Sequence, residues 1–312
     1  MKVKATTNRK IIAVVKADCY SNGYYIAKHI EGLVDAFACS ISIEAIKLRE
    51  IGVVKPILIL NYEKSQHNDV KKYDFIAGLS KIEDYDSDIT FHIAVDTGMN
   101  RLGFKSCYDL NNMLSYIDTS NIKGIYSHIY SSDINTINNQ LYRFYEYENI
   151  LKNYTLDYVS HISSSSNLIA SNKTFDYVRL GIGMYDGAIS ITSSIIMVKH
   201  IMPYESVGYN GEYISDIEQN IAICFGGYSD GIERVYKGNS VAINNKLYKI
   251  VGKISMDSFI IALGNDMYES GQKVSILDNE NIFLEDIENN SKLSKYEILT
   301  GFKGRYNYVY FN

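Results

Sequence analysis

The stretch IIAVVKADCYSNG, residues 11–23, joins a short apolar run to a lysine and a polar turn. Residues 11–15 are all apolar, which is typical of a strand buried on both faces of a parallel sheet. Lys16 follows where the strand gives way to a Tyr/Ser/Asn/Gly turn. In a parallel barrel this edge carries the catalytic groups. Lys16 is therefore either a reactive amine with a pKa lowered by burial, or a strand-end lysine that reaches solvent.

Short apolar runs of the same kind alternate with helix-like segments through about residue 187. Helical spacing is clearest at residues 43–51, 108–117 and 138–151. Eight strands that alternate with helices predict a TIM-type (β/α)8 barrel, which we assign to residues 1–188. The predicted strands are residues 11–16, 35–41, 56–61, 74–78, 89–95, 122–127, 157–162 and 176–182.

The pattern changes after Gly187, where predicted strands follow one another closely and long helices disappear. Gly, Asn and Asp mark the turns between them, as at residues 209–211 and 244–245. Residues 189–312 therefore predict a C-terminal, mostly β domain.

Composition limits the partners of the chain. Lysine and arginine number 31 against 36 acidic residues, which gives a formal charge of -5 without a basic block and argues against nucleic acid. No apolar run reaches the ~20 residues that span a bilayer, and the charged N-terminus lacks a signal-peptide core. The four cysteines show no CxxC spacing, so neither a metal site nor a disulfide framework is expected. These features predict a cytoplasmic protein without a membrane contact.

Eight sequence motifs occur in a fixed order and together resemble the alanine racemase family, enzymes of fold type III that use pyridoxal 5'-phosphate (PLP). The resemblance runs from about Ile11 to Tyr310. The motifs are VVKADCYSNG, DTGMNRLGF, YSHIYSSD, HISSSSN, VRLGIGMYDG, VGYNGEY, GGYSDGIER and GKISMD.

The resemblance implies a PLP site at the carboxyl ends of the barrel strands. Lys16 is implied to form a Schiff base with the cofactor aldehyde, and Arg179 to donate a hydrogen bond to the pyridine nitrogen. His128 and His161, which end the sixth and seventh predicted strands, are implied to lie near the ring or to support the arginine. The implied phosphate contacts are Tyr20, Ser165 or a neighbouring serine of 163–166, and the backbone N–H groups of Gly181 and Ile182.

Racemisation removes a proton from one face of the α-carbon and returns one to the other, so two groups on opposite sides are expected. The resemblance implies that Lys16 serves the D-side and Tyr209 the L-side. Tyr209 lies 19 residues before Tyr228, the spacing that the family shows. A free phenol with a pKa near ~10 is a weak base, so cationic neighbours must lower that pKa.

Substrate contacts are implied for Arg101, Met256, Asp257 and Tyr228. Three positions depart from the family pattern. Ala94 stands where many members carry a carbamylated lysine that orients the arginine of the DTGMNR motif. Gly304 stands where many carry a phosphate-contacting tyrosine, and Asn22 replaces the usual histidine of the lysine motif. Arg101 must then be held by chloride, water or another side chain.

The implied activity is the interconversion of L- and D-alanine for cell-wall peptidoglycan, in a homodimer whose active sites combine Lys16 of one chain with Tyr209 of the other. Serine as substrate, a degenerate homologue with weak or no catalysis, and a PLP-binding barrel without racemase activity remain alternatives. Residues 190–312 count against the last of these. Only fifteen residues precede Lys16, where family members usually carry a further strand and helix. We therefore expect exposed apolar side chains between the first and eighth barrel strands.

Overall fold

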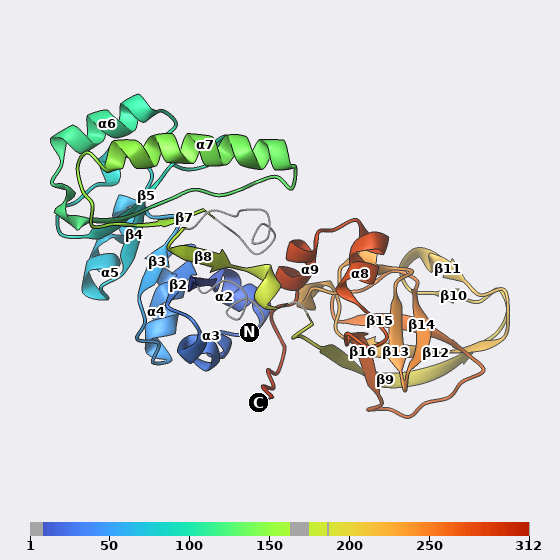
Figure 1. Cartoon of the computed structure of the whole chain (residues 1–312). Coiled ribbons are helices and arrows are strands. Elements are labelled where there is room, and N and C mark those ends of the chain that lie inside the picture. Colours follow the sequence, from blue (N-terminus) through green and yellow to red (C-terminus); the bar gives the residue numbers. More distant parts are fainter. Residues whose placement is uncertain (1–8, 163–174, 186, 312) are drawn as a thin grey trace. The chain divides into compact units, whose positions relative to one another are not determined.

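A computed structural model describes residues 9–162, 175–185 and 187–311. The chain divides into two compact units, which Figure 1 shows. The barrel unit comprises Met1–Cys19 and Gly23–Met184, and the β unit comprises Tyr20–Asn22 and Tyr185–Asn312. No helix within the described ranges is long and apolar enough to cross a membrane.

The barrel unit is built on eight strands, and every pairing between neighbours is parallel. Their order across the sheet is β7-β6-β5-β4-β3-β2-β1-β8. Nearly all strand residues are buried, which explains why the sequence shows apolar runs rather than alternation. The eight predicted strands are confirmed. They are β1 (Lys10–Val14), β2 (Ala36–Cys39), β3 (Ile57–Ile59), β4 (Ile76–Leu79), β5 (Thr90–Ala94), β6 (Ile122–Tyr126), β7 (Val159–His161) and β8 (Tyr177–Leu180).

Helices connect these strands, and the three predicted ones are confirmed within a few residues. The longest begins four residues earlier than predicted, because Asp133 accepts the Thr136 N–H at 2.8 Å and caps it. The α-helices of this part are α2 (Lys16–Ser21), α3 (Tyr25–Ile30), α4 (Ser42–Glu50), α5 (His67–Lys72), α6 (Cys107–Tyr116) and α7 (Ile134–Leu151). Five short 3-10 turns lie among the described elements of this unit, and the first two adjoin helices: Glu31–Leu33, Lys64–Gln66, Ile82–Asp84, Thr119–Asn121 and Ile182–Met184.

Two glycines make room for large polar rings inside the barrel. A Cβ atom on Gly78 would lie 2.4 Å from the Tyr126 hydroxyl, and one on Gly124 would lie 2.5 Å from the His92 ring. Gly124 is also the register partner of His92 across β5 and β6. The barrel therefore contains a buried layer of histidine and tyrosine that depends on these two small residues.

The expectation of an exposed apolar flank between the first and eighth strands is wrong for the strands themselves. The apolar side chains of β1, and those of Val178 and Leu180 on β8, are no more than 9% exposed. β1 pairs directly with β8 from Lys10–Tyr177 to Ala13–Leu180, so neighbouring side chains cover one another.

The β unit confirms the prediction of a mostly β C-terminal domain. Six of its strands close into an antiparallel barrel in the order β12-β15-β14-β13-β16-β9, and β10 pairs with β11 beside it. Figure 1 shows this barrel with two short helices. The elements are β9 (Ile191–Ile201), β10 (Ser206–Val207), β11 (Tyr213–Ile214), β12 (Gln219–Phe225), β13 (Ser240–Ile243), β14 (Lys246–Val251), β15 (Ser258–Gly264), β16 (Lys273–Leu277), α8 (Leu284–Ser291) and α9 (Lys295–Gly301).

Two turns of the β unit lie where Gly and Asn residues predicted them. Asn244 and Asn245 join β13 to β14 with φ of 49° and 66°, the left-handed pair that a two-residue hairpin needs. Tyr209–Gly211 forms a 3-10 turn in which Asn210 has a φ of 62°. Asparagine tolerates this conformation better than most residues, so both turns are encoded locally.

Candidate active site

Lys16 lies two residues beyond the end of β1, at the start of α2. The following residues, 17–21, all have φ between 53° and 62°, so this short helix is left-handed. Such a conformation costs an L-residue roughly 1–2 kcal/mol, and none of the five is glycine. Backbone hydrogen bonds from Cys19 N to Val15 O and from Gly23 N to Asp18 O hold the segment. The sequence predicted only a polar turn here.

The surroundings of Lys16 lower the pKa of its amine. Its pKa is lowered by burial and then by the positive charge of Arg101, while the carboxylate of Glu44 opposes the shift. Glu44 is held in place because it accepts the N–H groups of Ala17 and Ser40, each at 2.7 Å. A lowered pKa increases the fraction of free amine, the form that attacks an aldehyde.

Arg179 is the central buried cation of the barrel unit, 5% exposed on β8. Nη1 donates to the His161 carbonyl at 3.0 Å and to His161 Nδ1 at 2.7 Å. Nη2 donates to the Ser127 carbonyl and lies 3.5 Å from His128 Nδ1. Among the described residues no carboxylate forms an ion pair with it. Burial lowers its pKa to about 10, so the guanidinium stays protonated at neutral pH.

The histidines around Arg179 are neutral, and hydrogen bonds assign the tautomer of His161. Burial and the charge of Arg179 lower the pKa of His128 to about 4 and that of His161 well below its usual value. Because Arg179 donates to His161 Nδ1, the proton of His161 is on Nε2, which lies 2.9 Å from His92 Nδ1. The Tyr126 ring stacks on His161 at 5.1 Å. His92 and Tyr126 were not predicted from the sequence, although polar residues inside buried strands are a usable signal.

Arg101 lies in the turn after β5 and is exposed. Asp96 shapes this turn by accepting the N–H groups of Gly98 and Asn100 at 2.8 and 3.0 Å. Within the part of the chain that the structure describes, Arg101 has no ion pair, and Ala94 offers no group to hold it. Its charge nevertheless helps to lower the pKa of Lys16 and that of His128.

Of the predicted phosphate contacts, Gly181 and Ile182 belong to the barrel unit and Tyr20 to the β unit. Gly181 and Ile182 directly follow β8 and are partly exposed, as backbone donors for an anion must be. Tyr20 is 5% exposed in the β unit, with its ring 5.1 Å from that of Tyr185. Ser165 lies outside the described residues.

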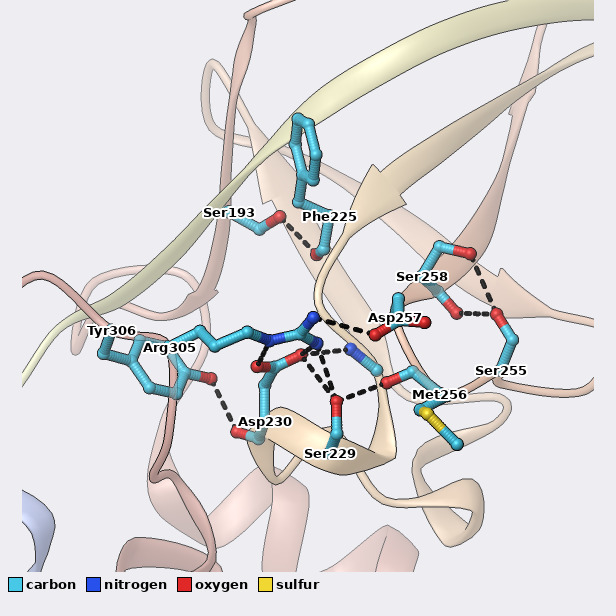
Figure 2. A network of polar contacts seen from close by, with 11 residues as sticks. Ser193, Phe225, Ser229, Asp230, Ser255, Met256, Asp257, Ser258, Arg305 and Tyr306 are labelled. Carbon is cyan, nitrogen blue, oxygen red and sulfur yellow. Dashed lines mark hydrogen bonds and ion pairs between the residues drawn. The ribbon is translucent and has the colours of Figure 1, made fainter.

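The β unit carries the other predicted residues. Tyr209 is 65% exposed in its 3-10 turn, so its hydroxyl is accessible to a ligand or a second chain. Tyr228 begins the turn Tyr228–Asp230 and has the Arg234 guanidinium 4.8 Å above its ring. Met256 and Asp257 lie in the exposed turn before β15. Figure 2 shows that Arg305, which was not predicted from the sequence, joins this turn to Asp230.

Profiles of the alanine racemase N-terminal and C-terminal domains match residues 1–188 and 188–310. The chain belongs to the alanine racemase family. Its curated relatives include alanine racemase of Streptococcus agalactiae, 31% identical over 94% of this chain and 89% of the relative, and that of Aquifex pyrophilus, 32% identical over 89% and 84%. These matches confirm the family resemblance that the motifs indicated.

Solved structures of the family share the fold. Alanine racemase from Bacillus anthracis, with bound L-Ala-P, is 25% identical and superposes with a TM-score of 0.89 over 97% of this chain and 89% of its own. Alanine racemase from E. faecalis is 26% identical, with a TM-score of 0.87 over 97% and 92%. Both matches span nearly the whole chain, so the two units occur together in the same family.

Proposed function

We propose that this protein interconverts L- and D-alanine with PLP as its cofactor and so supplies D-alanine for peptidoglycan. The observation that supports this most directly is the environment of Arg179. A buried guanidinium whose described partners are carbonyls and neutral histidines carries an uncompensated charge, which an acceptor or anion at the site would satisfy. The family relatives are named for the same reaction.

The residues present fit PLP. Lys16 offers an amine with a lowered pKa, Arg179 a fixed donor for the ring nitrogen, and Gly181 and Ile182 backbone donors after the last barrel strand. Tyr20 and Ser165 are the further phosphate contacts that we propose. When bound, the cofactor supplies an electron-withdrawing system that acidifies the α-proton of an amino acid. Because Arg179 keeps its own proton, it would donate a hydrogen bond to the ring nitrogen without transferring a proton to it.

Proton transfer at the α-carbon requires one group on each face. Lys16 Nζ, neutral more often than an ordinary lysine, takes or returns the proton on the D-side. The hydroxyl of Tyr209 of the partner subunit does so on the L-side. Arg101, and backbone N–H groups of Met256 and Asp257 of the partner subunit, hold the substrate carboxylate, while Tyr228 of the partner subunit narrows the entrance. The active form is therefore a homodimer with shared sites.

We place this activity in the cytoplasm. The cysteines Cys19, Cys39, Cys107 and Cys224 are all free thiols, which suits a reducing compartment. A cytoplasmic location also gives the enzyme access to free alanine.

Racemase activity of the PLP-loaded protein on L-alanine, followed by chiral chromatography, tests the proposal. We expect D-alanine to form until the concentrations of the two enantiomers are equal. L-serine, the alternative substrate, is assayed in the same way. Tyr209→Phe should abolish most activity, whereas the control Tyr204→Phe, at a tyrosine 82% exposed in the same unit, should not. PLP binding without formation of either D-amino acid would contradict the proposal and favour the degenerate homologue.

A further inference from the structure

Arg305 connects three segments of the β unit that are distant in sequence. Its Nε and Nη2 donate to Asp230 Oδ1 and Oδ2 at 2.8 and 2.6 Å, a bidentate pair. Nη2 also donates to Ser229 Oγ at 2.7 Å. Nη1 lies 2.8 Å from Asp257 Oδ1, so one guanidinium holds both carboxylates (Figure 2).

The two turns that Arg305 joins are also bonded to each other. We call residues 226–231 the Tyr228 turn and residues 255–258 the Asp257 turn. Tyr228 N donates to Ser255 O at 3.1 Å, and Ser229 donates twice to Met256 O, from N at 3.2 Å and from Oγ at 2.7 Å. A Cβ atom on Gly227 would lie 2.2 Å from Ser255 O, so the turns approach as closely as glycine permits.

The two carboxylates differ in their surroundings. The Asp230 side chain is 7% exposed and also accepts the Gly227 N–H at 3.0 Å, so it is the fixed end of the pair. Hydrogen bonds from Arg305 hold its pKa below the usual value. The Asp257 side chain is 62% exposed and has only Arg305 as its ion-pair partner among the described residues. Arg305 is therefore anchored on Asp230 and reaches outward to Asp257.

The charges of Asp257 and Arg305 affect how this turn binds a substrate carboxylate. The Asp257 turn is the one that we propose receives the carboxylate of an amino-acid substrate, yet it carries a carboxylate of its own. Two carboxylates a few ångströms apart repel each other, and a cation between or beside them removes this repulsion. Arg305 is the cation that the described structure places on Asp257.

We propose that Arg305 is a positioning residue of the substrate site: it fixes the Asp257 turn on the Tyr228 turn and neutralises Asp257, so that the turn accepts an amino-acid carboxylate. This inference rests on the proposed function and adds to it a residue outside the family motifs noted above. It predicts that Arg305 acts on substrate affinity rather than on proton transfer.

Steady-state kinetics of the PLP-loaded dimer with L-alanine test the inference. Arg305→Ala should raise KM about tenfold, the loss expected for a charge-assisted hydrogen bond, with kcat changed by less than about threefold. Arg305→Lys keeps the charge but not the bidentate geometry, so its KM should lie between those of the wild type and Arg305→Ala. Lys246→Ala removes an exposed ion pair with Asp266 in the same unit and serves as the control, with unchanged KM.

The double variant Arg305→Ala/Asp257→Asn separates positioning from general structural support. If Arg305 neutralises Asp257, removing that negative charge should recover part of the lost affinity, which a purely structural defect would not allow. An unchanged KM in Arg305→Ala, a fall in kcat alone, or no recovery in the double variant would each overturn the inference.

Hydrogen–deuterium exchange keeps this test independent of the reaction. Arg305→Ala should speed exchange in the Tyr228 turn and the Asp257 turn, with unchanged exchange in the barrel unit. Normal protection of both turns would refute the proposed link whether or not the wild type racemises alanine. If the wild type is inactive but Arg305→Ala alters exchange in the two turns, the proposed function and the substrate role of Arg305 are overturned. Only the structural link between the Tyr228 turn and the Asp257 turn then stands.

Discussion

Mild acid is expected to destabilise the fold through His92, the histidine buried in β5. Burial, and then the charge of Arg179, lower its pKa to about 4, against about 6.5 in the unfolded chain. Between these pH values the unfolded chain binds a proton that the folded chain does not bind. The free energy of unfolding therefore falls as the pH falls. By pH 5 this single group costs about 2 kcal/mol relative to pH 7. That loss is large beside a typical stability of about 5–15 kcal/mol.

Urea unfolding of the PLP-loaded protein at pH 7 and pH 5 measures this contribution. The wild type should lose more stability on acidification than His92→Asn, by about 2 kcal/mol, because asparagine does not titrate. For each variant, the unfolding free energy at pH 7 is compared with that at pH 5. The substitution also alters packing over Gly124, but this effect is the same at both pH values. His200→Asn is the control, because the His200 side chain is 51% exposed in the β unit. An equal pH dependence in wild type and His92→Asn would show that protonation of His92 does not destabilise the fold.

Four further substitutions test other parts of the structure. Lys16→Ala should abolish both activity and covalent attachment of PLP on borohydride treatment, measured by mass spectrometry; attachment at wild-type level would exclude Lys16. Tyr209→Phe should slow proton transfer on one face of the α-carbon more than on the other, seen as unequal entry of solvent deuterium into the two enantiomers. Arg179→Glu should slow racemisation and increase pyruvate formed from alanine, because a carboxylate favours protonation of the ring nitrogen. Gly124→Ala should lower the unfolding free energy by about 1–3 kcal/mol because its Cβ would meet His92, whereas Gly32→Ala, with open space at that position, should not.

The barrel was predictable from the sequence because strands buried on both faces appear as uninterrupted apolar runs. The same signal singled out Lys16, and the family resemblance added His128, His161 and Arg179, each of which lies at or just beyond the end of such a run. The structure brings Arg179 against both histidines, and the charge of Arg101 acts on Lys16. These groupings follow from parallel strands that end at one edge of a barrel.

Other features had no local signal. The ion pair of Arg305 with Asp230 joins residues 75 positions apart, and nothing in the tail sequence KGRYNYVY indicates a partner. The His92–His161 contact depends on the register of β5, β6 and β7 and on the space above Gly124. Sequence patterns show that a polar residue is buried, but only the assembled sheet shows which group it meets.

The left-handed segment after Lys16 reverses the usual rules of substitution. Elsewhere in a helix, replacing alanine by glycine loses about 1 kcal/mol, because glycine gives up more freedom on folding. At Ala17, where φ is 53°, glycine instead escapes a steric cost of roughly 1–2 kcal/mol. A systematic scan of residues 17–21 should therefore tolerate glycine at exposed Ala17 yet reject it at Cys19 and Tyr20, whose side chains are buried. Side-chain contacts, and not backbone preference, would then be what fixes the handedness of the chain beside the lysine.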